Sequence, residues 1–143
     1  MNLEVLAAVL TGWIIAQTGF LPPPPPQIAL VRKERMVELA FGAHATEGNV
    51  RALYDRNTET IYLREGWDPK DLRSRSELLH ELVHHVQNFN KVPSQCDAAR
   101  ERDAYHLQFA WLIEQGIQDP YSFLEINELM VVLLSLCRDR DLD

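Results

Sequence analysis

Residues 74–90 repeat apolar and polar positions with the period of an α-helix. At about 100° per residue, one side of this helix is apolar and the other side is polar. Ser74 and Glu77 have the spacing of a capping box at its start, and Pro93 stops it. The pattern predicts a two-sided helix whose apolar side faces the core. That side is formed by Leu78, Leu79, Leu82, Val83, Val86 and Phe89.

Residues 96–113 show a second helical pattern, in which one face carries several polar side chains. Ala104 on this face is small enough to let another helix approach closely. We therefore expect the face to pack across the polar side of residues 74–90. Asp103 lies about 200° from Glu101 and should point elsewhere. The face consists of Asp97, Glu101, Ala104, Tyr105, Gln108 and Leu112.

The first 21 residues are apolar enough to suggest a signal peptide or a membrane anchor. However, Glu4 stands where such segments carry Lys or Arg, and no clear A-x-A cleavage site follows. Gly12 and Gln17 also leave the apolar run short for crossing a bilayer. We therefore predict an amphipathic helix at residues 1–21 that packs on the domain, without membrane contact. Its stripe consists of Leu3, Leu6, Ala7, Leu10, Trp13, Ile14 and Gln17.

The proline run at residues 22–26 predicts a stiff connector that rises about 3 Å per residue. Residues 27–143 are then expected to form a single domain, and 46% hydrophobic residues in the chain can supply its core. The net charge of −7 and the pI near 5.2 argue against a phosphate-backbone partner. We therefore expect no nucleic-acid binding.

Shorter elements fill the rest of the domain and set the fold class. The apolar run at 130–134 should lie in the core, with a dimer contact as the alternative. Strands and helices follow one another without a repeated βα unit, which indicates an α+β fold. The elements expected are a strand at 27–31, a helix at 32–41, a hairpin of 50–54 and 60–63, the two helices above, and a last helix at 121–136.

The candidate chemistry lies on the polar side of the helix at 74–90, in the motif H-E-x-x-H. His80 and His84 are one turn apart and lie about 40° from each other, with Gln87 on the same side of the helix. Two neighbouring imidazoles can hold Zn²⁺, and Glu81 beside them can take a proton from water that the metal activates. The alternative is a chance match with both imidazoles in ordinary hydrogen bonds.

A catalytic zinc site usually has a third protein ligand. Glu101 is the first candidate for this ligand, and Asp97, one turn earlier on the same face, is the second. In the alternative interpretation Glu101 belongs to a solvated cluster of charges at residues 100–103. Three further histidines, His44, His85 and His106, are expected to be surface, capping or packing residues rather than ligands.

These residues resemble the gluzincin type of zincin metallopeptidases, which pair HExxH on one helix with a Glu from the next. The matching positions are His80, Glu81 and His84, followed by Glu101 with Ala104. The resemblance implies one Zn²⁺ ion and a water nucleophile. It also implies a minimal zincin-like domain, in which a small sheet or hairpin packs on the HExxH helix beside the Glu-bearing helix and a C-terminal helix.

The chain is also similar to short uncharacterised HExxH-domain proteins, whose motif continues as His84-His85-Val86-Gln87 does here. The resemblance spans about residues 50–115. The resemblance to zincins implies that residues 60–63 form an edge strand that lies along the active-site cleft and pairs with extended substrate backbone. A strand that only covers the metal helix is the ordinary alternative.

The function expected from this site is zinc-dependent peptide hydrolysis, with a peptide or protein as the substrate. Glu81 would be the general base, and Tyr105 is a candidate for stabilising the developing oxyanion. Gln87, Asn88 and Asp97 could orient the ligands. Two other interpretations are a zinc-containing peptide-binding module without activity and a metal-free helical domain.

Cys96 and Cys137 match no cysteine-based zinc spacing. The sequence leaves open whether they are two buried thiols or one disulfide. A cytoplasmic and a secreted location stay open with it.

Overall fold

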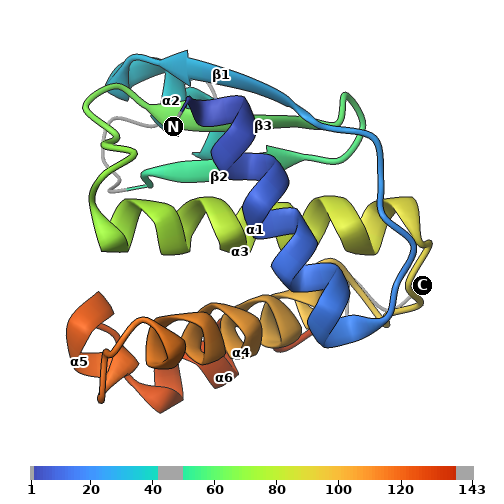
Figure 1. Cartoon of the computed structure of the whole chain (residues 1–143), viewed down its shortest axis with the longest axis vertical. Coiled ribbons are helices and arrows are strands. Elements are labelled where there is room, and N and C mark those ends of the chain that lie inside the picture. Colours follow the sequence, from blue (N-terminus) through green and yellow to red (C-terminus); the bar gives the residue numbers. More distant parts are fainter. Residues whose placement is uncertain (1, 42–49, 138–143) are drawn as a thin grey trace.

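Helix α3 (Leu72–Phe89) occupies the middle of the computed structural model, which describes residues 2–41 and 50–137. A three-stranded sheet lies on one side of this helix and helix α4 (Ala99–Glu114) on the other (Figure 1). Most of its side chains are buried, because both neighbouring layers cover it. The predicted two-sided helix at 74–90 is confirmed, and the fold is α+β, with six helices and a small sheet among the described residues.

The start of α3 differs from the capping box expected at Ser74 and Glu77. The N-cap is Asp71, whose carboxylate accepts hydrogen bonds from the amide and the hydroxyl of Ser74, both at 2.9 Å. Glu77 lies too far inside the helix to cap it and pairs with Arg51 at 3.2 Å. The capping prediction was wrong because the first turn begins at Leu72, which places Ser74 at the third helical position.

Replacing Asp71 with alanine should lower the free energy of unfolding by about 1 kcal/mol near neutral pH, the usual effect of losing an N-cap. The hydrogen bond from the Ser74 amide is the main cause that lowers the pKa of Asp71 below its ordinary value of 3.8. Because the folded pKa is the lower one, this stabilisation is present above the unfolded pKa and is lost as the pH falls through the folded pKa. Urea unfolding of both proteins over this pH range measures the effect. The exposed Asp103→Ala variant is the control, and an equal loss in both variants would contradict the capping role.

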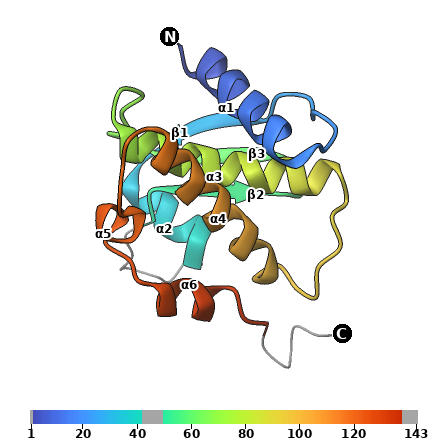
Figure 2. The same ribbon diagram turned by 60° about the horizontal axis from the view of Figure 1, so that its bottom comes forward.

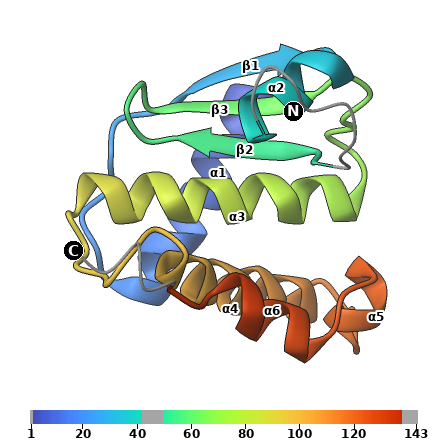
Figure 3. The same ribbon diagram turned by 180° about the vertical axis from the view of Figure 1, so that it is seen from behind.

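The sheet has the order β1-β3-β2, with β1 (Gln27–Val31) parallel to β3 (Thr60–Arg64). Strand β2 (Ala52–Asp55) pairs antiparallel with β3, so the predicted hairpin is confirmed. The prediction that residues 60–63 form an edge strand is wrong. The chain passes from β1 through α2 (Lys33–Phe41), and β1 then pairs with β3, which becomes the central strand. Strand β2, next to α3, has an edge that no other described strand covers (Figure 3).

Helix α1 (Leu3–Thr18) crosses over α3 and belongs to the same hydrophobic core (Figure 1). Its indole at Trp13 also donates a 2.7 Å hydrogen bond to Glu114 at the end of α4. No helix in the described ranges is long and apolar enough to cross a membrane. The predicted helix is present and packs on the domain, but it is less two-sided than expected, because Gln17 at the end of its stripe is exposed and so are the apolar Val5 and Val9. Its buried residues are Leu6, Ala7, Leu10 and Ile14.

The single helix expected at residues 121–136 is two helices, α5 (Pro120–Leu124) and α6 (Glu128–Leu134). Helix α5 ends at Glu125, which has a left-handed backbone conformation with φ of 59°. Asn127 then caps the start of α6. The expectation that the apolar run 130–134 lies in the core is also wrong. Val131 is 5% exposed and lies on the side of α6 that packs against α4, whereas Leu133 is 58% exposed, because among the described residues α6 packs mainly against α4 (Figure 2).

A disulfide joins Cys96 to Cys137, whose Cα atoms are 5.9 Å apart. It ties the turn before α4 to the segment that follows α6. Helix α4 itself begins at Ala99, three residues later than the pattern from Cys96 indicated. Of the two states that the sequence left open, the cysteines form the disulfide.

Candidate metal centre

The HExxH residues lie on the side of α3 that faces α4. The rings of His80 and His84 stand next to each other, with centroids 5.0 Å apart and planes inclined at 76°. Because residues four apart in a helix share a face, this proximity follows directly from the motif spacing. His80 is buried and His84 is nearly so, and both present Nε2 to the same space.

Helix α4 brings Glu101 to this space. One carboxylate oxygen lies 2.9 Å from Nε2 of His80, and the other lies 2.8 Å from Nε2 of His84. Ala104, one turn later, is completely buried between the helices, as expected for a close approach. Within the described ranges, the ligand atoms of these three residues converge to within 4.8 Å of one another, so the group could hold a metal ion.

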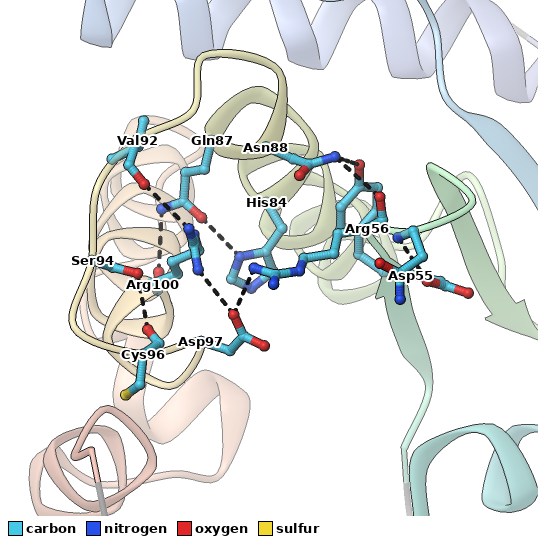
Figure 4. Close-up of polar contacts among 12 residues, drawn as sticks. Asp55, Arg56, His84, Gln87, Asn88, Val92, Ser94, Cys96, Asp97 and Arg100 are labelled. Atoms are coloured by element: carbon cyan, nitrogen blue, oxygen red, sulfur yellow. Dashed lines mark hydrogen bonds and ion pairs between the residues drawn. The ribbon is translucent and has the colours of Figure 1, made fainter. Parts of the chain in front are cut away.

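The second candidate for the third ligand, Asp97, lies elsewhere. Its side chain is 75% exposed and forms ion pairs with Arg56 at 2.8 Å and Arg100 at 2.9 Å (Figure 4). Residues 96–98 precede α4 instead of forming its first turn, so Asp97 does not share the face of Glu101. Its ion pair with Arg56 connects the turn between β2 and β3 to the start of α4, beside His84.

One atom of the cluster lacks an ordinary hydrogen bond. Nε2 of His84 is buried and has no hydrogen-bond partner in the described part of the chain, although Glu101 lies 2.8 Å away. The contact therefore counts as an ion pair and not as a hydrogen bond. Two imidazole nitrogens and a carboxylate form the usual ligand set of a catalytic zinc site. The residues therefore fit a metal ion of this kind.

In the metal-free protein, charge holds the three side chains together. Burial alone would raise the pKa of Glu101, but the contacts with His80 and His84 lower it well below its usual range. For His84 burial acts in the opposite direction and would lower the pKa, but the carboxylates of Glu101 and Glu81 raise it to about 9. The cluster without metal is thus a set of salt bridges.

Glu81 lies beside the cluster and is not one of its three converging residues. Its side chain is buried, and this burial raises the pKa of its carboxyl group, an effect that the nearby His80 and His84 partly oppose. A hydrogen bond from the backbone amide of Tyr54 on β2 also lowers the pKa of Glu81. Glu81 is therefore a carboxyl group with a raised pKa that joins α3 to strand β2 beside the two histidines.

Two cavities lie along β2 and share Glu81 and Glu101 in their lining, and we refer to them together as the groove. The first, of about 290 Å³, extends past His80 and Tyr105, and the second, of about 460 Å³, extends past His84. Leu53 of β2 also lines both cavities. The groove therefore runs between the uncovered edge of the sheet and α4, with the histidines near its middle.

Tyr105 lies against His80, with ring centroids 4.6 Å apart, and lines the smaller cavity. Burial is the main cause that raises its pKa to about 12, and the carboxylates of Glu101 and Glu81 add to it. The phenol therefore keeps its proton at neutral pH. Its side chain lies next to the candidate metal ligands, as its position on the same predicted helix face as Glu101 indicated.

The ligand histidines have hydrogen-bond partners of their own. Nδ1 of His84 lies 2.9 Å from the amide oxygen of Gln87, as expected from the sequence (Figure 4). Nδ1 of His80 lies 2.9 Å from the amide oxygen of Gln108, which was not among the predicted orienting residues. The sequence contained an indication of this role, because Gln108 is a polar residue on the helix face that was expected to pack against residues 74–90.

Other sequence candidates lie outside this set of contacts. Asn88 donates to the Tyr54 hydroxyl at 3.1 Å and to the Arg56 carbonyl at 3.2 Å, so it supports the wall of the groove rather than a ligand. His85 is buried and packs as predicted, between Tyr54 and the carbonyl of Pro24. His106 is exposed, and His44 lies outside the described residues.

Neither the curated proteins nor the solved structures contain a match to this chain. A family model does match, and it covers residues 2–143. The match therefore includes α1, the sheet, both helices that meet at the histidine and glutamate cluster, and the C-terminal helices. The chain belongs to the family described as "Domain of unknown function (DUF6647)".

Proposed function

We propose that this protein is a zinc-dependent hydrolase of the gluzincin type that cleaves peptide bonds. The observation that carries the proposal is the convergence of His80, His84 and Glu101 beside a buried glutamate, Glu81, that is not part of the ligand group. A structural zinc site needs only its ligands. A separate carboxyl group with a raised pKa at the same place is what a general base requires.

The three converging residues would hold Zn²⁺ through Nε2 of each histidine and a carboxylate oxygen of Glu101. When bound, zinc supplies a Lewis acid that lowers the pKa of water from about 15.7 towards about 7. Glu101 neutralises part of the positive charge and fixes the position of α4 relative to α3. In this arrangement the minimal zincin-like domain consists of the sheet, α3, α4 and the C-terminal helices.

Glu81 would accept the proton of the attacking water and later deliver it to the leaving amine. Its burial favours the neutral carboxyl group, so its affinity for a proton is higher than that of an exposed glutamate. Tyr105 would donate a hydrogen bond to the oxygen of the scissile carbonyl as negative charge develops there. Its raised pKa keeps it a donor throughout the neutral pH range.

The substrate class follows from the uncovered edge of β2. The amide of Arg64 donates to the carbonyl of Arg51 at 2.9 Å, and in an antiparallel pair such bonded positions alternate. The backbone groups of Ala52 and Tyr54 therefore point away from β3, towards the groove. An extended peptide could pair with Ala52 as an added strand and carry its scissile bond past Glu81. The edge strand of the proposed zincin-like site is thus β2.

The proposal is tested by metal content and chelation. Protein purified without chelator or affinity tag should contain one zinc per chain, and it should cleave members of a fluorogenic peptide library. Removing zinc should abolish the cleavage and adding it back should restore it. Less than about half an equivalent of zinc would count against the metal site. Stoichiometric zinc without cleavage would instead support a peptide-binding module.

A further inference from the structure

We propose that Gln87 and Gln108 are positioning residues that hold both ligand histidines as the neutral tautomer with its proton on Nδ1. This inference rests on the zinc site of the proposed function, but not on peptide cleavage. It assigns a role to two buried glutamines, each 3% exposed, that face the two ligands from different helices.

The hydrogen bonds around His80 determine which atoms donate. The hydroxyl of Ser76 donates its single proton to the carbonyl of Arg73 at 2.8 Å, so towards Gln108 it can only accept. Nε2 of Gln108 donates to that hydroxyl at 3.1 Å, which turns its amide oxygen to Nδ1 of His80. An amide oxygen only accepts, so Nδ1 of His80 carries the proton. In the neutral ring, Nε2 is then left with a lone pair that faces Glu101.

A second, independent series of hydrogen bonds gives the same result at His84. Nε2 of Gln87 donates to the carbonyl of Arg100 at 3.2 Å, so its amide oxygen faces Nδ1 of His84 at 2.9 Å. Nδ1 must again carry the proton. The opposite nitrogen, Nε2, is the buried atom for which the described part of the chain provides no hydrogen bond. The two series of hydrogen bonds end on backbone carbonyls of different helices, one on α3 and one on α4.

Neither amide can turn over without loss. If Gln87 turned, its oxygen would face the carbonyl of Arg100 and its NH₂ group would face the N–H of His84. Leaving such buried polar groups unpaired is unfavourable, because each has lost its hydrogen bonds to water. Gln108 is held in the same way by Ser76, which is completely buried. The surrounding protein therefore fixes a proton on Nδ1 of each ring, so that a metal ion would replace only a proton on Nε2.

The partners of the two ligands are also uncharged. A carboxylate partner would make an imidazole more basic and a stronger ligand, whereas an amide fixes its orientation without adding charge. Glu101 is then the negatively charged member of this five-residue group. This keeps a bound divalent ion more strongly positive than carboxylate partners would.

The test is the zinc affinity of variants, measured by competition with a chromophoric chelator. Gln108→Leu removes the acceptor with a side chain of similar size and should weaken zinc binding about 10- to 100-fold, the usual effect of losing such a partner. Gln108→Glu restores an acceptor and should bind zinc at least as tightly as the wild type. Gln118→Leu, at an exposed position, is the control and should leave zinc affinity unchanged.

A second measurement needs no variant. In wild-type protein with ¹⁵N-labelled histidine and bound ¹¹³Cd²⁺, the metal should couple to Nε2 of both ligand histidines, and Nδ1 should carry the proton. Coupling to Nδ1, or wild-type zinc affinity in a folded Gln108→Leu protein, would overturn the inference and leave the zinc site standing. Wild-type protein that binds neither metal would overturn the proposed function together with it.

Discussion

Replacing Glu81 with glutamine should lower peptide hydrolysis by about 10²- to 10⁴-fold, the range expected for losing a general base. Glutamine has nearly the same shape as glutamate but cannot take a proton from water. Glu81 is not one of the converging ligand residues, so zinc content should stay at one per chain. The loss should therefore appear in the turnover number and not in metal binding.

The same variant should be at least as stable as the wild type. Burial raises the pKa of Glu81 in the folded protein, so the protonated side chain fits the fold better than the charged one. The stabilisation from this protonated form is present below the unfolded pKa and is lost as the pH rises through the folded pKa. A neutral glutamine removes the cost of keeping a charged group buried. Loss of activity with equal or higher resistance to urea would distinguish a catalytic glutamate from a structural one.

Glu77 provides a matched control for this experiment. It lies one turn earlier on α3, is mostly buried, and lines the smaller cavity, but its carboxylate pairs with Arg51. Glu77→Gln should keep hydrolysis within a few-fold of the wild type, since it touches neither ligand histidine. Cleavage that persists undiminished in Glu81→Gln would refute Glu81 as the base.

Replacing Glu101 with glutamine should weaken zinc binding by more than about 100-fold, beyond the effect expected for a residue that only supports a ligand. The carboxylate contacts both imidazoles, and glutamine offers zinc a neutral and weaker ligand. In the metal-free protein the same change removes the negative charge that raises the pKa of His84 to about 9. The His84 pKa should therefore fall, because burial is then opposed by less negative charge.

Asp97→Asn is the matched control, because Asp97 was the other sequence candidate for the third ligand. Its exposed side chain contacts Arg56 and Arg100, so the substitution should leave zinc affinity unchanged. Affinity would be measured by chelator competition and the His84 pKa by histidine NMR titration without metal. Zinc loss in Asp97→Asn with full binding in Glu101→Gln would show that the third ligand is wrongly assigned.

Strand pairing and the C-terminal helices show where sequence patterns stop being informative. The hairpin of β2 and β3 was predictable because its strands are close in sequence and separated by a turn. The pairing of β1 with β3 joins residues about 33 apart, and no local signal indicated which strand would be central. The apolar run in α6 predicted burial, yet burial needs a neighbouring layer on each side, and within the described ranges α6 packs mainly against α4.

The sequence by itself determined the chemistry within single helices. Four-residue spacing placed His80 beside His84, and the two-sided pattern of α3 turned both towards the next helix. Only the tertiary structure decided what faced them. A helical wheel could not separate Glu101 from Asp97, because the wheel assumes that the helix already includes both, and α4 begins at Ala99. Gln108 reached His80 for a similar reason: contacts between helices depend on where each helix starts and how closely they pack, and neither is encoded in spacing along one chain segment.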